Sequence, residues 1–324
     1  MLAAAGQAAT AFNQNAIGIQ QASSNLNNET NSTVANINQI ASDIAAINQQ
    51  YRSNSQATQD AGLDARLNSD LESLSQLVNY TAIKTSDGST SIFVGGQTPL
   101  VQADQTYALS ADLSHPQTAI LDSQGNDVTA QLTAAGGSLG AILQEKNVTL
   151  PGYLGSLNNL AQGFADQVNT ALGQGVDLNG NPPATNLFNY NAAQGVAFTF
   201  SVTNITGSQI AAASAGAPGG NGNAIAIAQL ANQASLNGFT FTQAYGNLGG
   251  QVGRDVAAAQ QNQTAQQGLL SQAQQARATA SGVDLNAEAS KILQFQQSYQ
   301  AIGKVVTVLN TLTDTIMNMM TVTP

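Results

Sequence analysis

The chain lacks cysteine and tryptophan and has few charged side chains. Without cysteine it forms no disulfide and holds no thiolate, which excludes disulfide scaffolds and cysteine-based catalysis. Charged residues make up 8% of the 324 residues, with 8 Lys plus Arg against 18 Asp plus Glu. The formal charge of −10 leaves little to neutralise a phosphate backbone, so nucleic acid is not an expected partner.

Long apolar runs are also missing. The most apolar stretch, residues 302–320, is interrupted by Lys304, Asn310 and Asp314, so no membrane insertion is expected. The first residues, Met-Leu-Ala-Ala-Ala-Gly, lack the basic and apolar regions of a cleaved signal peptide. Gln, Asn, Ser and Thr supply most of the polarity (mean hydropathy −0.08), which suits surfaces that become buried against other subunits.

The C-terminal segment has the clearest pattern in the chain. From residue 285 to residue 320, apolar side chains recur in alternating three- and four-residue steps over roughly four to five heptads, as in a coiled coil. A helix with one apolar stripe needs a partner, so we expect this assembly seam to pack loosely in an isolated monomer. Its members are Leu285, Ile292, Phe295, Tyr299, Ile302, Val306, Leu309 and Ile316.

The N-terminal segment repeats this periodicity. Seven-residue series that include Phe12, Ile19 and Ile37 predict one helix over residues 1–51, on the order of 70 Å long. Polar residues fill the stripe between Ser23 and Thr33, which leaves a break near residues 25–32 open.

Between the two ends, the sequence alternates between helical and strand-like patterns. Period-two stretches separated by Asp-Gly and Gly-Gly turns predict antiparallel strands in 80–132, and strands are also expected in 190–206. A break is expected at Leu150-Pro-Gly, with Pro151 as the first residue of the following helix. Further helices are predicted at 62–79, 138–145, 153–172 and 241–280.

These elements predict a mainly α fold with inserted β structure. Both chain ends would form a long coiled-coil-like helical bundle that carries antiparallel β-rich modules. The predicted domains are the long helices at 1–79, a β-rich module at 80–135, returning helices at 136–172, a turn- and strand-rich insertion at 173–237, a helix at 238–281, and the terminal helix at 282–324.

Three places resemble chemical sites, and each has a simpler explanation. His115 is the only histidine and precedes Pro116, so an exposed turn is favoured over catalysis. Asp177-Leu-Asn-Gly-Asn begins like a calcium loop, but Pro182 and Phe188 stand where an EF-hand needs Gly and Glu. The acidic cluster is interpreted as a solvated helix face and turn, and comprises Asp60, Asp64, Asp70 and Glu72. We therefore predict no catalytic, cofactor-binding or metal-binding residue, and no enzyme.

Several motifs resemble a known family. The segments 281–289 (SGVDLNAEA) and 293–301 (LQFQQSYQA) are similar to the C-terminal motif shared by flagellar rod, hook and hook-associated proteins. In the interior, the motifs are similar to the family of flagellar hook-associated protein 1; they are Gly-Gly-Ser-Leu-Gly from Gly136, Leu-Pro-Gly-Tyr from Leu150, Asp-Leu-Asn-Gly-Asn from Asp177, Ile-Ala-Ala-Ala-Ser from Ile210 and Asn-Ala-Ile-Ala from Asn223. Leu-Asp-Ala-Arg from Leu63 also matches, although Leu67 follows where the family usually has Asp.

The resemblance implies a structural role. It implies a junction ring of copies of the chain between hook protein and the second hook–filament junction protein, with an export chaperone on the terminal helix. It also implies an extracellular flagellar location, reached by the flagellar type III route. Nothing before Phe12 resembles the family's N-terminal helix, so its export signal cannot be assigned here. Another axial protein such as hook protein, or a wall-polymer hydrolase, are the alternatives.

Overall fold

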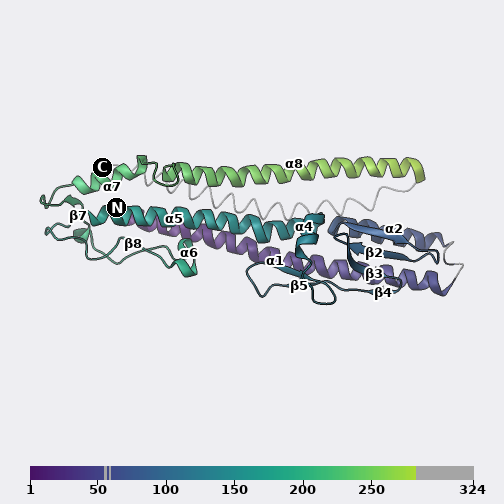
Figure 1. Cartoon of the computed structure of the whole chain (residues 1–324). Helices are drawn as coiled ribbons and strands as arrows, with labels where there is room; N and C mark the ends of the chain where they lie inside the picture. Colours follow the sequence, from purple (N-terminus) through teal and green to yellow (C-terminus); the bar gives the residue numbers. More distant parts are fainter. Residues whose placement is uncertain (55–56, 58–59, 282–324) are drawn as a thin grey trace. The chain divides into compact units, whose positions relative to one another are not determined.

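The computed structural model describes residues 1–54, 57 and 60–281, with side chains up to residue 276. The chain forms two compact units: unit 1 contains Met1–Ala22 and the chain from Tyr153 onward, and unit 2 contains Ser23–Gly152. The model confirms a mainly α fold with small antiparallel sheets (Figure 1). Within the described ranges, no helix has the length and apolar character needed to cross a membrane.

Helix α1, Leu2–Ser53, runs without interruption through both units, so the break left open near residues 25–32 does not occur. Two of its buried polar side chains bond to its own backbone: Thr30 Oγ1 donates to the Leu26 carbonyl over 2.7 Å, and Asn15 Nδ2 donates to the Ala11 carbonyl over 2.7 Å. These bonds satisfy polar groups that are buried within the helical stripe.

Unit 2 packs a small sheet and short helices against the C-terminal part of α1 (Figure 1). Its sheet is an antiparallel meander in the order β1-β2-β3-β4, which confirms the predicted antiparallel strands. The elements are α2 (Ala61–Leu77), β1 (Tyr80–Lys84), β2 (Thr90–Val94), β3 (Thr98–Gln102), β4 (Gln105–Thr106), the paired β5 (Ser110–Asp112) and β6 (Ala119–Leu121), α3 (Thr129–Ala135) and α4 (Gly137–Gln144). The core includes the fully buried Ile37, Ile44, Ile47, Leu74, Ile92, Leu100, Ile120, Leu132 and Leu139.

The Gly-Gly-Ser-Leu-Gly motif lets chain segments approach closely in unit 2. Gly137 has φ +76°, and a Cβ there would lie 2.8 Å from the Leu77 carbonyl oxygen and the Val78 Cα. A Cβ at Gly140 would lie 2.9 Å from the Leu132 carbonyl oxygen. Both glycines are therefore required by packing rather than by flexibility.

The predicted helix break before Pro151 is wrong. Helix α4 continues through a π-helical turn, η2 (Glu145–Thr149), into helix α5 (Leu150–Gly173). In this turn the Leu150 N–H donates to the Glu145 carbonyl, five residues earlier. We attribute the continuity to this wider turn, because in a regular α-helix the Pro151 ring would clash with the carbonyl four residues before it.

Unit 1 is built on the first part of α1, on α5 and on helix α8 (Phe241–Ser281), with irregular chain between α5 and α8 (Figure 1). Five phenylalanines join these parts, with ring centroids 4.9–6.4 Å apart. The members of this phenylalanine cluster are Phe12, Phe164, Phe188, Phe200 and Phe241.

The connection between α5 and α8 contains less strand than predicted. Residues 196–199 form a helical turn, α6 (Val196–Thr199), where the sequence indicated a strand. Gly195, at φ +95°, opens the turn, and Asn13 Nδ2 donates to the carbonyl of Ala197 over 2.7 Å, so the local bonds outweigh the β-branched and aromatic composition. The other elements are β7 (Gly175–Val176) paired with β10 (Ala213–Ser214), β8 (Phe188–Asn189) paired with β9 (Ser201–Val202), η3 (Ala192–Gln194), η4 (Gly207–Gln209), α7 (Gly222–Gln229) and η5 (Leu230–Asn232).

Candidate functional site

The predicted assembly seam, Leu285 to Ile316, lies outside the described residues. It stays a prediction. The three places that resembled chemical sites, and the side-chain contacts that stabilise each unit internally, are within the described part of the chain.

His115 lies on an exposed turn between β5 and β6. Its Nδ1 is 2.9 Å from Ser114 Oγ and 3.7 Å from Asp112 Oδ2, and 76% of its side chain is exposed. The Ser114 hydroxyl and N–H donate to Asp112, and these bonds lower the pKa of that carboxyl. The contacts are local to one turn, as expected for a structural histidine.

Asp177 turns its carboxylate back to its own loop. Its Oδ1 accepts from the backbone N–H groups of Asn179 and Asn181, each over 2.8 Å. The Gly180 N–H donates to the Asp177 carbonyl, which closes the turn. Within the described ranges, no group of three or more His, Cys, Asp or Glu side chains is placed to hold a metal ion.

The acidic cluster on α2 is less solvated than predicted. Asp60 is the N-cap of α2 and accepts from the N–H groups of Gly62 and Leu63 over 2.8 and 3.3 Å. Asp64 accepts from the buried Tyr51 hydroxyl over 2.9 Å, which joins α2 to α1. Burial, and then this bond to a carboxylate, raises the pKa of Tyr51 to about 12. Burial also raises the pKa of Asp70. Asp64 and Asp70 are therefore only partly exposed, and the interpretation as a solvated face is incomplete for Asp64, which also bonds to α1.

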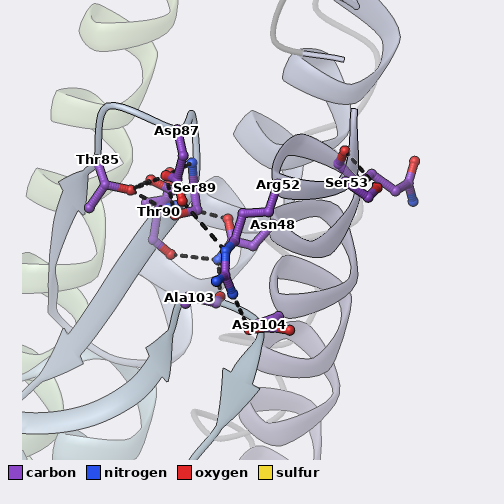
Figure 2. A network of polar contacts seen from close by, with 10 residues as sticks. Asn48, Arg52, Ser53, Thr85, Asp87, Ser89, Thr90, Ala103 and Asp104 are labelled. Atoms are coloured by element: carbon purple, nitrogen blue, oxygen red, sulfur yellow. Dashed lines mark hydrogen bonds and ion pairs between the residues drawn. The ribbon is translucent and has the colours of Figure 1, made fainter. Parts of the chain in front are cut away.

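A polar network ties the sheet of unit 2 to the last turns of α1 (Figure 2). Arg52 forms ion pairs with Asp87, 3.5 Å from Nε to Oδ2, and with Asp104. Asp87 also accepts from Thr85 Oγ1 and from the hydroxyl and N–H of Ser89, and these bonds lower its pKa to about 2. One arginine thus fixes the tips of two neighbouring turns, β1–β2 and β3–β4.

Asn48 lies one helical turn before Arg52, in the same network, and is fully buried. Its Oδ1 accepts from the Thr90 N–H over 2.8 Å, and its Nδ2 donates to the carbonyls of Thr90 over 2.9 Å and Ala103 over 2.6 Å. The side-chain amide therefore pairs with the backbone of Thr90 as a neighbouring strand would.

The same arrangement recurs in both units, and we name it the asparagine clasp. Each clasp uses one helical Asn whose Oδ1 and Nδ2 bond to the N–H and carbonyl of a single residue in irregular or strand chain. The four clasps are Asn38 with Leu109, Asn48 with Thr90, Asn147 with Thr118 and Asn169 with Phe188, with bonds of 2.8–2.9 Å. The clasps thus fix strand or irregular segments to helices within each unit, which is a structural role.

Comparison with known proteins assigns the chain to a family. Residues 1–188, more than half of the chain, match the family model of the flagellar hook-associated protein FlgK helical domain. The chain belongs to the FlgK family. It is therefore a flagellar hook-associated protein and a structural component of the flagellum, as its motifs predicted.

Two FlgK relatives illustrate the extent of the similarity. Flagellar hook-associated protein 1 of Bacillus subtilis (strain 168) is 25% identical over 360 residues, which cover 98% of this chain and 71% of the relative. The solved structure of the flagellar hook junction protein FlgK from Burkholderia pseudomallei is 30% identical with a TM-score of 0.48. The match covers 55% of this chain and 34% of that chain, so the alignment spans about a third of the solved protein. The alternatives of a hook protein and a hydrolase receive no support.

The sequence analysis did not predict the clasps or the Arg52 network of this FlgK family member. A signal was present for Asn48, because it lies in the apolar stripe of α1 beside Ile44 and Tyr51, and a polar amide in such a stripe must find buried partners. Nothing in the sequence pairs Arg52 with Asp87 and Asp104, because the turns that bring them together are set by the register of the sheet.

Proposed function

We propose that the chain is the subunit of a ring that joins the hook to the filament. Its neighbours there would be copies of itself, hook protein and the second hook–filament junction protein, with an export chaperone bound to the terminal helix beforehand. Membership in the FlgK family carries this proposal, and the printed name of the Burkholderia relative, a hook junction protein, agrees with it. The subunit would be exported by the flagellar type III route and would work outside the cell.

A mechanical role is also supported by how the described side chains are used. His115, Asp177 and Asp60 are each bonded within their own turn or helix cap. The Arg52 network and the asparagine clasps hold turns, strands and irregular chain on long helices. Groups that only fix backbone suit a subunit that transmits force, and we propose no enzymatic activity.

Deletion of the gene tests the proposal. The expected result is cells with hooks but no filaments by negative-stain microscopy, and filaments restored by the full chain. Filaments of normal length in the deletion strain would overturn the proposal. His115→Ala and Asp177→Asn are expected to leave motility near normal, since both residues lie in turns.

The terminal seam is tested separately. Ile302→Asp places a charge in the predicted stripe, which costs several kcal/mol if it stays buried in the assembly. We expect the exported variant to retain the hydrogen-exchange protection of residues 153–172 while failing to support filaments. Slow exchange at 290–315 in the wild-type monomer, equal to that at 153–172, would show that the seam has a partner within the chain and would contradict this assignment.

A further inference from the structure

Helix α1 has a polar segment in its middle, residues 23–33. Nine of these eleven residues are Ser, Asn or Thr, which have a lower helix propensity than Ala, Leu, Gln or Glu because their side chains compete for backbone hydrogen bonds. From residue 20 to residue 29, no side chain of the helix is buried. The last buried apolar side chain before the polar segment is Ile19, and the next is Val34. Most of the polar segment is therefore stabilised neither by its helix propensity nor by an apolar core.

The chain that lies against the polar segment is also weakly helical. It is η2, from which Lys146 Nζ donates to the Ser23 hydroxyl and, over 3.4 Å, to the Ser23 carbonyl. The bonding of η2 is π-helical, and Pro151 and Gly152 follow it at the start of α5. Proline and glycine have the lowest helix propensities of all residues. Two weak stretches, one on α1 and one on the returning helix, thus contact each other.

A lysine fills the contact between the two stretches. Lys146 is 6% exposed and is the buried side chain of residues 144–149. Both oxygens that it bonds in Ser23 are neutral, and burial lowers its pKa. An apolar side chain of similar volume often stabilises a buried position as well or better. The flexible stem of lysine, however, lets the ammonium keep its bonds when the two backbones shift.

The contact lies where the chain divides into its two units. The division falls between Ala22 and Ser23 in α1, and between Gly152 and Tyr153 in α5. Val34 is the first residue of α1 in the core of unit 2. Because no apolar side chain of α1 is buried from residue 20 to residue 29, a bend in this stretch exposes little apolar surface to water. Both helices that continue from one unit into the other are therefore weakest at the same level.

We infer that the polar segment and η2 form a hinge, at which α1 and the continuous helix from α4 to α5 bend together. A few residues that absorb the change in backbone angles are sufficient for such a motion. The hinge belongs to the single subunit, so it does not depend on the proposed ring. Within a ring, it would allow copies in different surroundings to adopt different bends.

Distances between spin labels test the hinge, and the absence of cysteine permits selective labelling. Gln14→Cys with Ser32→Cys places labels at exposed positions on either side of residues 20–29. Ser32→Cys with Gln50→Cys, equally far apart along α1 and beside the core of unit 2, is the matched control. In a straight helix each pair is about 27 Å apart. We expect the first pair to give a distance distribution at least about twofold broader than the control pair, by pulsed electron paramagnetic resonance of the purified chain.

Two variants designed to stiffen the hinge give a second readout. Asn25→Ala with Asn28→Ala raises the helix propensity at two exposed positions, and Lys146→Met replaces the buried cation by an apolar side chain of similar length. Each should narrow the distribution of the first label pair toward that of the control pair without lowering the Tm. Asn36→Ala with Ser42→Ala, at exposed positions of α1 outside the polar segment, should leave the distribution unchanged.

Equal widths for the two label pairs in the wild-type chain would overturn the inference. It would also be overturned if Asn25→Ala with Asn28→Ala left the first distribution as broad as before, and this variant decides the question if Lys146→Met does not fold. A lower Tm of Lys146→Met with an unchanged width would show that Lys146 is an ordinary structural contact. These measurements need no flagella, so filaments of normal length in the deletion strain would contradict the proposed function and leave the hinge in place.

Discussion

Charged side chains are divided unevenly between the two units. In residues 1–22 and 153–276, the charged residues are Asp166, Asp177, Arg254 and Asp255, whereas unit 2 has carboxylates on α2 and on most of its turns. Both units nevertheless use the same contact, the asparagine clasp, to hold irregular chain on a helix. The two units therefore differ in the charge of their surfaces and share the type of contact that holds irregular chain on a helix. Unit 2 has a surface suited to water, and unit 1 has one suited to burial against another protein.

The largest expected effect is a loss of stability when the core of unit 1 is altered. Phe200→Ala removes a fully buried ring that contacts Phe12 and Phe188, and should lower the free energy of unfolding by about 3–5 kcal/mol. Hydrogen exchange should accelerate at residues 1–22 and 188–202 while residues 80–121 keep their protection. Phe239→Ala, at a ring that is 46% exposed, is the matched control and should change little. Equal acceleration in both units would show that they do not have separate cores.

The next largest effect is a loss of stability in unit 2 where two backbone segments lie close together at Gly137. Gly137→Ala combines a φ of +76° with a Cβ 2.8 Å from the chain at Leu77 and Val78, and should cost at least about 1–3 kcal/mol by urea unfolding. Gly155 lies within α5 with no atom within 4 Å of an added Cβ. Gly155→Ala should therefore be neutral or stabilise by up to about 1 kcal/mol. Equal losses at both sites would contradict the packing role assigned to Gly137.

The clasps should have similar strength in both units. Asn48→Ala leaves the buried Thr90 N–H without its acceptor, and Asn169→Ala does the same to Phe188, so each should cost about 1–3 kcal/mol. Exchange of the Thr90 and Phe188 amides should accelerate in the corresponding variant. Asn36→Ala, on the exposed side of α1, should change stability by less than about 0.5 kcal/mol. If the Thr90 or Phe188 backbone amide keeps its slow hydrogen exchange in the corresponding variant, that clasp is dispensable.

The smallest effect is a pH dependence confined to unit 2. The pKa of Asp87 is lowered from 3.8 to about 2 in the folded chain, so its contribution to stability is present above about pH 4 and is lost as the pH falls toward 2. The difference in Tm between wild type and Asp87→Asn should therefore shrink over this range. A difference that stays constant from pH 6 to pH 2 would show that the Arg52 network does not depend on the Asp87 charge.

Periodicity predicted the helices well because burial of one face determines them: α1, α2, α5 and α8 lie close to their expected positions. It failed where single contacts decide the conformation. The π-helical turn before Pro151 and the helical turn at 196–199 depend on specific backbone bonds that an apolar pattern does not encode. The clasps were missed for the same reason, since each joins a helical Asn to a residue at least nineteen positions away in sequence. The predicted absence of a metal or catalytic site stays a prediction.

The contrast between the two surfaces is tested most directly by cysteine labelling. Ile17→Cys and Leu269→Cys report on unit 1, and Ile83→Cys, at a 52% exposed residue of β1, reports on unit 2. Each single variant is treated with a maleimide as a purified monomer and in isolated flagella. All three sites should react in the monomer, and in flagella the first two should be protected while Cys at position 83 keeps reacting. Equal reactivity of all three sites in flagella, or protection at position 83 alone, would contradict the assignment of unit 1 as the surface buried between subunits.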